Sequence, residues 1–374
     1  ICIDKEIFLN QNDCKIFDRL NYFEKMNIDY YAVQFSGATV HPICYSIKDE
    51  EKKKISNKKI LAKFISIKNA INLIKPKYYL PSAGPAIFPF LDPNLSFGED
   101  NIFPHQPKIK KIFSELNTQL VFMRPGENFK NSLNNPPINP PTKNELMNLK
   151  SSLNCDFFKY QDNDLNIIAL KEQIKLRLDQ IKDIKFSKCP MLFFKSGHQG
   201  LKIDLNMGSF EDMDVEINKL KKDYVCVEAL PGYFNLMANP NFRWQDISLS
   251  FRAIIHRNPD LFNTFINIFL FSDISNIREG FKTTLSINDE RIVIVNPHNG
   301  KNFEINRFCP HNGADLKNAK IDIKGNLICP RHSWLFDLEN KGKCKKANAS
   351  IASKEIEETI TICESISARL LKKN

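Results

Sequence analysis

Short apolar runs alternate with longer stretches of helical period over residues 1–129, a pattern typical of an α/β layer architecture. Four apolar runs in this part of the chain predict strands. They are ICIDKEIFL (residues 1–9, closed by the turn-like residues 10–13), YYAVQF (30–35), YYLP (78–81) and QLVFMRPG (119–126). The first third of the chain is therefore expected to be a layered α/β domain.

Two stretches between these runs have the spacing of helices. The first covers residues 17–26, and the second is a long charged stretch over residues 48–74 that Pro76 ends. In the long stretch one face is predicted to be apolar. That face comprises Ile60, Leu61, Phe64, Ile67, Ile71 and Ile74.

The segment NNPPINPP, residues 134–141, is the clearest boundary signal, because proline can neither continue a helix nor complete a sheet interior. Beyond it, residues 164–184 predict an amphipathic helix, and residues 244–271 are expected to be largely helical. Three apolar runs in the same region predict strands. They are MLFFKSG (191–197), KIDLNMG (202–208) and DYVCVEAL (223–230).

From about residue 281 the pattern changes to short strands separated by turns, as in an all-β module. The predicted strands are TTLSIND, RIVIVNP, NFEINRF and NLICP, with turns at Asn299-Gly300 and Lys324-Gly325. The whole chain is therefore predicted to have four parts. These are a first α/β domain (1–133), a proline-rich linker (134–144), a mixed α+β region (145–280) and a C-terminal all-β domain (281–374).

Composition is that of a folded protein, with 42% hydrophobic and 26% charged residues. The formal net charge of +10 comes from lysines spread along the chain, so we interpret it as a solvated surface; no nucleic-acid-binding motif occurs. No apolar run approaches the roughly 20 residues of a membrane span. A cytoplasmic protein is expected, and the opening Ile1 indicates a fragment of a longer chain.

Two cysteine-histidine pairs stand out in the C-terminal part. The sequences CPHNGADL from Cys309 and CPRHSWLFD from Cys329 form the pattern C-x-H, 17 intervening residues, and C-x-x-H, with ligand candidates Cys309, His311, Cys329 and His332. Two soft thiolates suit one iron and two neutral imidazoles suit another. A structural zinc site usually places like ligands together, and a nucleophilic Cys-His pair needs only two of the four. We therefore predict a [2Fe–2S] cluster as the cofactor.

These loops resemble Rieske domains of the oxygenase and ferredoxin type. Rieske subunits of respiratory complexes carry an extra, disulfide-bonded cysteine in each loop, and Ala314 and Arg331 stand at those places. The resemblance thus implies the low-potential class. Ser333 stands where most members have glycine, and this departure is expected to tune hydrogen bonding to the cluster.

The other histidines are far apart in sequence: His41, His105, His198, His256 and His298. Ring-hydroxylating Rieske oxygenases hold a mononuclear iron with two closely spaced histidines and a carboxylate. The spacing disfavours that class. Whether the protein also binds a further iron outside the cluster is left open.

The first domain resembles the C-terminal half of a metallo-β-lactamase fold. The strand ICIDKEIFL leads to Asp13, which is similar to the aspartate that bridges two metals in that superfamily. The upstream H-x-H-x-D-H motif is absent. In YYLPSAGP, Ala83 and Gly84 stand where those hydrolases present their last histidine, which puts a hydrolytic dinuclear site in doubt.

Four stretches resemble the CMP-N-acetylneuraminate hydroxylase family. They are FSGATVHP (35–42), YYLPSAGP (78–85), RPGENF (124–129) and WQDISLSFRAIIHRNPDLFN (244–263). Animal members carry the Rieske domain first, whereas here it is last, so the order implies a rearranged relative.

This resemblance implies an O2-dependent monooxygenase that hydroxylates a CMP-sialic-acid-like nucleotide sugar. Electrons would come from a reductase through cytochrome b5 or a ferredoxin, and the cluster would receive them. Two alternatives remain, a non-catalytic electron-transfer protein and a metallo-β-lactamase-fold hydrolase with a redox domain. For His41 a structural role is expected, and Asp13 is left open as a ligand.

Overall fold

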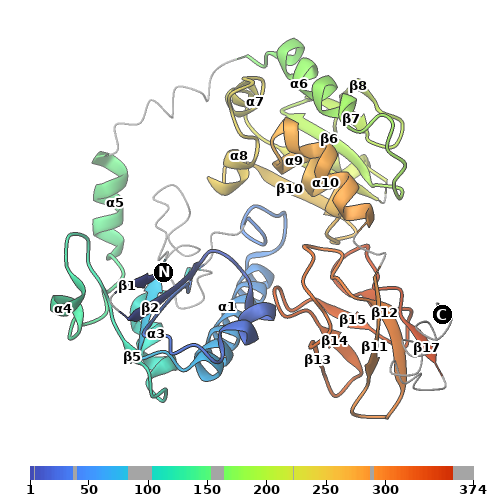
Figure 1. Ribbon diagram of the computed structural model, residues 1–374. Coiled ribbons are helices and arrows are strands. Elements are labelled where there is room, and N and C mark those ends of the chain that lie inside the picture. Colours follow the sequence, from blue (N-terminus) through green and yellow to red (C-terminus); the bar gives the residue numbers. More distant parts are fainter. Residues whose placement is uncertain are drawn as a thin grey trace. The chain divides into compact units, whose positions relative to one another are not determined.

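The computed structural model describes residues 1–3, 5–36, 40–82, 103–152, 164–221, 223–286 and 290–356. The chain forms two compact units (Figure 1). Unit 1 contains Ile1–Leu261 and Phe265–Lys282, and unit 2 contains Phe262–Thr264 together with the residues from Thr283 onward. Unit 1 is mixed α/β and unit 2 is rich in β-strands, as the sequence predicts at this coarse level.

The first sheet of unit 1 has five strands that follow one another in chain order. They are β1 (Cys2–Ile3), β2 (Glu6–Asn12), β3 (Tyr30–Gln34), β4 (Tyr78–Ser82) and β5 (Gln119–Leu120). β1 pairs antiparallel with β2, and the remaining neighbours pair in parallel. The prediction of one strand over residues 1–9 is therefore wrong. Lys5, with a φ of 73°, lies at the turn between two strands.

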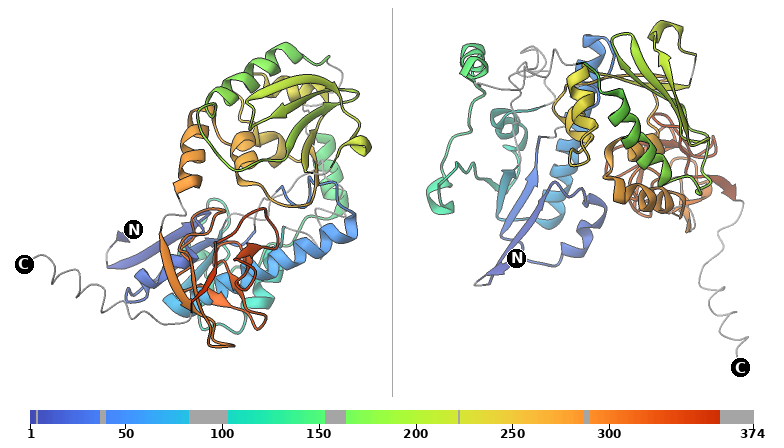
Figure 2. Two further views of the ribbon diagram at one scale, coloured as in Figure 1. Left: turned by 90° about the vertical axis from the view of Figure 1, so that its right-hand side faces the viewer. Right: turned by 90° about the horizontal axis from the view of Figure 1, so that it is seen from above.

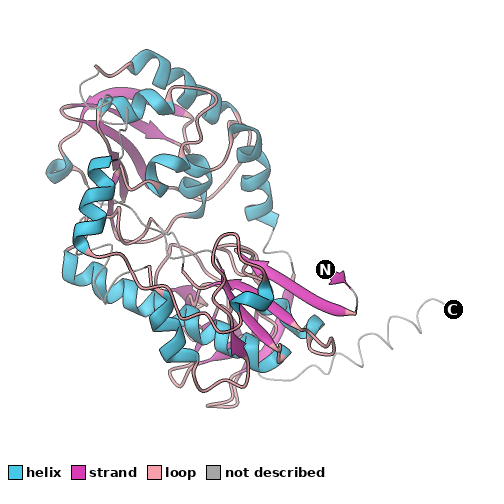
Figure 3. Cartoon of the chain, turned by 90° about the vertical axis from the view of Figure 1, so that its left-hand side faces the viewer, coloured by secondary structure: helices cyan, strands magenta, loops and turns pink. Residues whose placement is uncertain are grey.

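Helix α1 (Asp49–Ile74) runs along this sheet (Figures 2 and 3). Its buried face contacts Tyr31, Val33 and Tyr79 of the sheet, and comprises Ile60, Phe64, Ile67, Ala70, Ile71 and Ile74. Lys75, with a φ of 47°, caps the helix in the left-handed region just before Pro76. Leu61 was predicted on this face but is 59% exposed, because one residue after Ile60 the helix has turned by about 100°.

The described residues of this part of the chain also form four shorter helices: η1 (Phe17–Phe23), α3 (Gln106–Phe113), α4 (Phe129–Ser132) and α5 (Lys143–Ser152). The predicted helix over residues 17–26 is thus a shorter 3₁₀ helix. The proline-rich residues 135–142 form neither helix nor strand. Their backbone is nevertheless anchored, since the amide N–H of Ile138 donates to Oε1 of Gln106 (2.7 Å).

The second sheet of unit 1 has the strand order β10-β9-β6-β7-β8. The strands are β6 (Met191–Ser196), β7 (Gln199–Asp204), β8 (Ser209–Asp214), β9 (Tyr224–Glu228) and β10 (Ile254–Asn258). β6 and β9 pair in parallel, and the other neighbours pair antiparallel. β10 overturns the expectation that residues 244–271 are largely helical, and β8, with its polar sequence SFEDMD, was not predicted.

Helices pack against one face of this sheet (Figure 1). They are α6 (Ile167–Asp179), α7 (Pro231–Met237), α8 (Gln245–Leu249), α9 (Thr264–Phe271) and α10 (Ile274–Ser286). The short 3₁₀ helix η3 (Ile217–Lys219) packs instead with a separate cluster that contains Phe193 and Cys226. α10 overturns the prediction that TTLSIND begins with a strand, because Thr283–Ser286 continue this helix. No helix in the described part of the chain is long and apolar enough to cross a membrane.

A buried arginine joins two of these helices. The side chain of Arg177, on α6, donates from Nη1 to the carbonyl oxygens of Phe269 (2.6 Å) and Ser272 (3.0 Å) at the end of α9. Its guanidinium also lies 3.9 Å from the ring centre of Trp244. The cation thus meets the negative end of the α9 dipole, which offsets part of the cost of its burial.

Unit 2 contains two antiparallel sheets. The first is formed by β11 (Arg291–Val295), β12 (Asn302–Asn306) and β17 (Lys354–Ile356), and the second by β13 (Lys320–Ile321), β14 (Asn326–Ile328), β15 (Leu335–Asp337) and β16 (Lys343–Cys344). Both sheets contribute to one core. Its fully buried side chains include Phe303, Ile305, Leu316, Leu327, Phe336 and Ile351.

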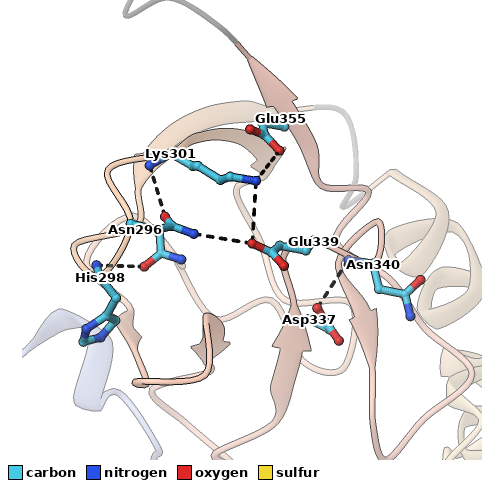
Figure 4. A network of polar contacts seen from close by, with 8 residues as sticks. Asn296, His298, Lys301, Asp337, Glu339, Asn340 and Glu355 are labelled. Carbon is cyan, nitrogen blue, oxygen red and sulfur yellow. Dashed lines mark hydrogen bonds and ion pairs between the residues drawn. The ribbon is translucent and has the colours of Figure 1, made fainter.

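A polar network joins the two sheets of unit 2 at its surface (Figure 4). Lys301 is the last residue of the β11–β12 turn. Its Nζ lies 3.1 Å from Oε2 of Glu355 and 3.8 Å from Oε1 of Glu339. The buried Asn296 side chain accepts from the amide N–H of His298 (3.1 Å) inside the same turn. Because Lys301 is well exposed, solvent screens these ion pairs and their contribution is small.

We predict unequal effects for two glycine substitutions in unit 2. Gly342 (φ 66°) and Gly300 (φ 71°) are both left-handed, but a Cβ on Gly342 would lie 2.5 Å from Cγ1 of Ile351, whereas nothing lies within 4 Å of one on Gly300. Gly342→Ala should reduce the free energy of unfolding by about 2 to 4 kcal/mol, and Gly300→Ala by about 1 to 2 kcal/mol. Urea denaturation measures both, and equal losses would contradict the crowding argument.

Candidate metal centre

Two loops of unit 2 carry the four predicted ligands. The first begins after Phe308, which forms a β-bridge with Asp315. The amide N–H of Cys309 donates to the carbonyl oxygen of Ala314 (2.9 Å), and that of Gly313 donates back to the carbonyl oxygen of Cys309 (2.9 Å). These two bonds close a tight loop, and His311 lies near its tip.

The second loop repeats this bonding pattern between β14 and β15. The amide N–H of Cys329 donates to the carbonyl oxygen of Trp334 (2.8 Å), and that of Ser333 donates to the carbonyl oxygen of Cys329 (2.9 Å). In both loops the residue four positions after the cysteine is left-handed, with φ of 60° at Gly313 and 53° at Ser333. The two loops are therefore built alike, although their sequences share little beyond Cys-Pro.

The loops bring all four predicted residues together in pairs. The Cys309 thiol donates a hydrogen bond to the Cys329 sulfur. The ring centres of His311 and His332 lie 4.5 Å apart. Both sulfurs are buried, and the Nδ1 atoms of both imidazoles are shielded from solvent. A two-iron cluster takes two ligands per iron, so two adjacent pairs of this chemistry fit it.

Backbone amides surround the two sulfurs. The N–H groups of His311 and Asn312 donate to Sγ of Cys309, and those of His332 and Arg331 donate to Sγ of Cys329. The contact between the thiols, helped by these amides, holds the pKa of Cys329 below its usual range, while the proton shared with Cys329 raises the pKa of Cys309. The arrangement stabilises negative charge at the sulfur pair.

Two aromatic rings cover His311. Trp334 stacks on its imidazole, with ring centres 4.2 Å apart and planes inclined by 6°, and Phe262 meets the same ring edge-on at 4.8 Å. Phe262 is held in place by its backbone. Its N–H donates to the carbonyl oxygen of Lys346 (3.0 Å), and its own carbonyl oxygen accepts from Asn348 (3.2 Å).

Sequence reasoning missed Phe262, because nothing in a lone phenylalanine far upstream distinguishes it from the Phe-rich core of unit 1. The bridge between Phe262 and Ala347 is a long-range pairing that no local pattern reports. Trp334, by contrast, lies inside the second motif. Residues Phe262–Thr264 therefore form a strap that belongs to unit 2 although the chain on either side belongs to unit 1.

An ion-paired arginine fixes the base of the first loop. Nε and Nη2 of Arg307 donate to Oδ2 of Asp315 (3.1 and 2.7 Å), and Nη1 donates to Oε1 of Glu290 (2.5 Å). The hydrogen bonds with Asp315 and Glu290 raise the pKa of Arg307 above its ordinary value. Arg307 and Asp315, which lie on either side of Cys309 in the chain, are thus held together, and Glu290 also anchors Arg307.

The other histidines lie in different elements. His256, on β10, is hydrogen bonded through Nε2 to Oε2 of Glu228 (2.8 Å), His41 packs edge-on against Tyr45 (4.7 Å), and His105 precedes α3. His198 is in the β6–β7 turn, and His298 is in the β11–β12 turn. Among the described residues, no group of three or more His, Cys, Asp or Glu side chains could hold a single metal ion.

Asp13 lies just past β2, at the carboxyl end of the parallel sheet, and its charged neighbours are lysines. Burial, with a smaller contribution from Lys15, lowers the pKa of Lys63 to about 8, while Asp13 acts in the opposite direction. Nζ of Lys63 donates to Oε1 of Gln34 (3.1 Å). Ala83 and Gly84, which were compared with a hydrolase metal site, lie outside the described residues.

The shared loop geometry predicts opposite effects of two substitutions. Ser333→Gly should raise the free energy of unfolding of unit 2 by about 0.5 to 1 kcal/mol, because glycine relieves the left-handed strain at a smaller entropic cost. Gly313→Ala should lower it by about 1 kcal/mol or more. Thermal unfolding of the two variants beside the wild type measures both, and a destabilised Ser333→Gly would show that the serine hydroxyl makes a compensating contact.

Comparison with known proteins identifies one family. No curated protein and no solved structure matches the chain. Residues 267–357 match the family model of the Rieske [2Fe-2S] domain, and they include both loops. The C-terminal part of this chain therefore contains a Rieske domain, and its cofactor is a [2Fe–2S] cluster.

Proposed function

We propose that Cys309, His311, Cys329 and His332 ligate the cluster, with the two thiolates on one iron and the two imidazoles on the other. The observation that carries this proposal is the repeated loop geometry, which pairs thiol with thiol and imidazole with imidazole. When bound, a Rieske cluster supplies one-electron transfer. Rieske domains are typical of oxidoreductases, including oxygenases.

The residues around the sulfurs are suited to that chemistry. Four amide N–H groups point at the two sulfurs, and such donors stabilise the extra negative charge that arrives with an electron. Trp334 and Phe262 exclude water from one face of His311. Because His311 and His332 are only partly buried, the imidazole pair is the point at which we expect an electron to enter.

The finer form of the proposal is an O2-dependent monooxygenase that hydroxylates a CMP-sialic-acid-like nucleotide sugar. Its support is the resemblance of residues 35–42, 78–85, 124–129 and 244–263 to the CMP-N-acetylneuraminate hydroxylase family. Cytochrome b5 or a ferredoxin, reduced by a reductase, would supply electrons, and the net charge of +10 suits an acidic donor and an acidic substrate. The first sheet with α1 would correspond to half of a metallo-β-lactamase-like domain.

The hydrolase alternative is less favoured. The carboxylate of Asp13 has two ammonium groups, those of Lys15 and Lys63, as its charged neighbours, whereas a metal-bridging aspartate needs cationic metal in that place. The simple electron carrier remains the rival of the monooxygenase. It differs from the monooxygenase in one measurable respect, since substrate would not stimulate its O2 uptake.

The ligand set predicts the fate of two cysteine variants. Cys309→Ser should abolish the rhombic EPR signal of the reduced protein, because serine oxygen replaces a soft thiolate. Cys344→Ser is the matched control, since Cys344 is also a buried cysteine of unit 2 but is outside both loops. A signal retained in Cys309→Ser, or lost equally in both variants, would contradict the assignment.

The activity is tested on the full chain with a reductant, an electron-donor protein, O2 and CMP-sialic acid. We expect a product heavier by one oxygen atom in mass spectrometry, with O2 uptake that depends on the substrate. A reversible cluster with no product across related nucleotide sugars would instead establish the electron carrier.

A further inference from the structure

The side chain of Arg331 bonds the second loop to the first. Nη1 of Arg331 donates to the backbone carbonyl oxygen of Asn312 at 2.7 Å. Asn312 directly follows His311, and Arg331 directly precedes His332. The bond therefore joins the residues next to the two proposed imidazole ligands, His311 and His332.

The same two residues also contact the sulfurs through their backbones. The amide N–H of Asn312 donates to Sγ of Cys309, and that of Arg331 donates to Sγ of Cys329. Together with the contact between the two sulfurs, these bonds close a ring. Moving one loop away from the other would break the Arg331 bond and the contact between the two sulfurs together, while the amide on each sulfur stays within its own loop.

The guanidinium also brings charge to the sulfur pair. Its Nη1 lies 2.7 Å from the carbonyl oxygen of Asn312, and the amide N–H of that same residue donates to Sγ of Cys309. Arginine stays protonated under all ordinary conditions, so this charge is permanent. A fixed positive charge near the sulfurs favours the state of the site that carries more negative charge, which is the reduced one.

We propose that Arg331 is a positioning residue that clasps the two ligand loops together and raises the reduction potential of the centre. This inference rests on the proposed ligand set. It gives the arginine a double role, because its hydrogen bond keeps the loops closed on the cluster and its charge stabilises the added electron. The two roles are separable, since lysine keeps the charge but lacks the planar fork of donors.

The experiment uses the full chain loaded with its cluster and three variants. Arg331→Met removes the clasp and the charge, and Arg331→Lys keeps the charge. Arg291→Met is the matched control, because Arg291 donates to Asn306, Glu304 and Ala352, none of which is in either ligand loop. Two quantities are measured, the rate at which visible absorbance decays under an iron chelator and the midpoint potential by spectroelectrochemistry.

We expect Arg331→Met to lose iron about tenfold faster than the wild type, the factor that one hydrogen bond with a charged partner contributes. Its midpoint potential should be lower. Arg331→Lys should lose iron faster but keep a midpoint close to that of the wild type, and Arg291→Met should match the wild type in both measurements.

Unchanged iron loss in Arg331→Met would overturn the clasp, and a midpoint that falls equally in the methionine and lysine variants would overturn the charge effect. These outcomes leave the ligand set standing, because the wild-type absorbance tests it separately. A wild-type chain with no [2Fe–2S] absorbance would overturn the ligand set and the clasp together.

Discussion

The need to bring the sulfurs of Cys309 and Cys329 together in one buried place is the constraint that shapes both ligand loops. Two buried sulfurs that carry negative charge repel each other unless donors surround them. Each loop meets this need by turning its own backbone back on the cysteine, so that amides point at the sulfur. That turn requires a left-handed residue four positions after each cysteine, and both loops have one.

The supporting structure follows from the same need. The backbone bonds inside each loop fix its shape but not its position, so the ends of the loop must be fixed by the surrounding structure. The β14–β15 hairpin does this for the second loop. Arg307, paired with Asp315 and Glu290, does it for the first, where no long strand continues on both sides.

Local chemistry was readable from the sequence. The spacing around Cys309 and Cys329 predicts the cluster, and the apolar period of residues 48–74 predicts α1 almost to its ends. The geometry at Ser333 was not readable, because serine gives no sign of a left-handed backbone. Only the bond pattern shared with Gly313 explains why glycine is the usual residue there.

Two of the errors come from tertiary contacts that no local pattern reports. β10 was missed because its sequence IIHRN has little alternation, and its strand form depends on pairing with β9 and on the bridge between Ile255 and Tyr45. The TTLS segment has β-branched residues and was predicted as a strand, yet it extends α10, whose Ile277 and Phe281 are fully buried. Packing of those two side chains outweighs the weak local preference.

The strap at Phe262–Thr264 means that the redox module is not a continuous piece of sequence. A gene segment that began at residue 267 or 283 would encode both ligand loops but leave one side of His311 bare. A polypeptide that began at either residue would therefore need another aromatic ring at the position of Phe262. The stretch of chain needed to build this centre begins at Phe262 and is therefore longer than the stretch that carries its ligands.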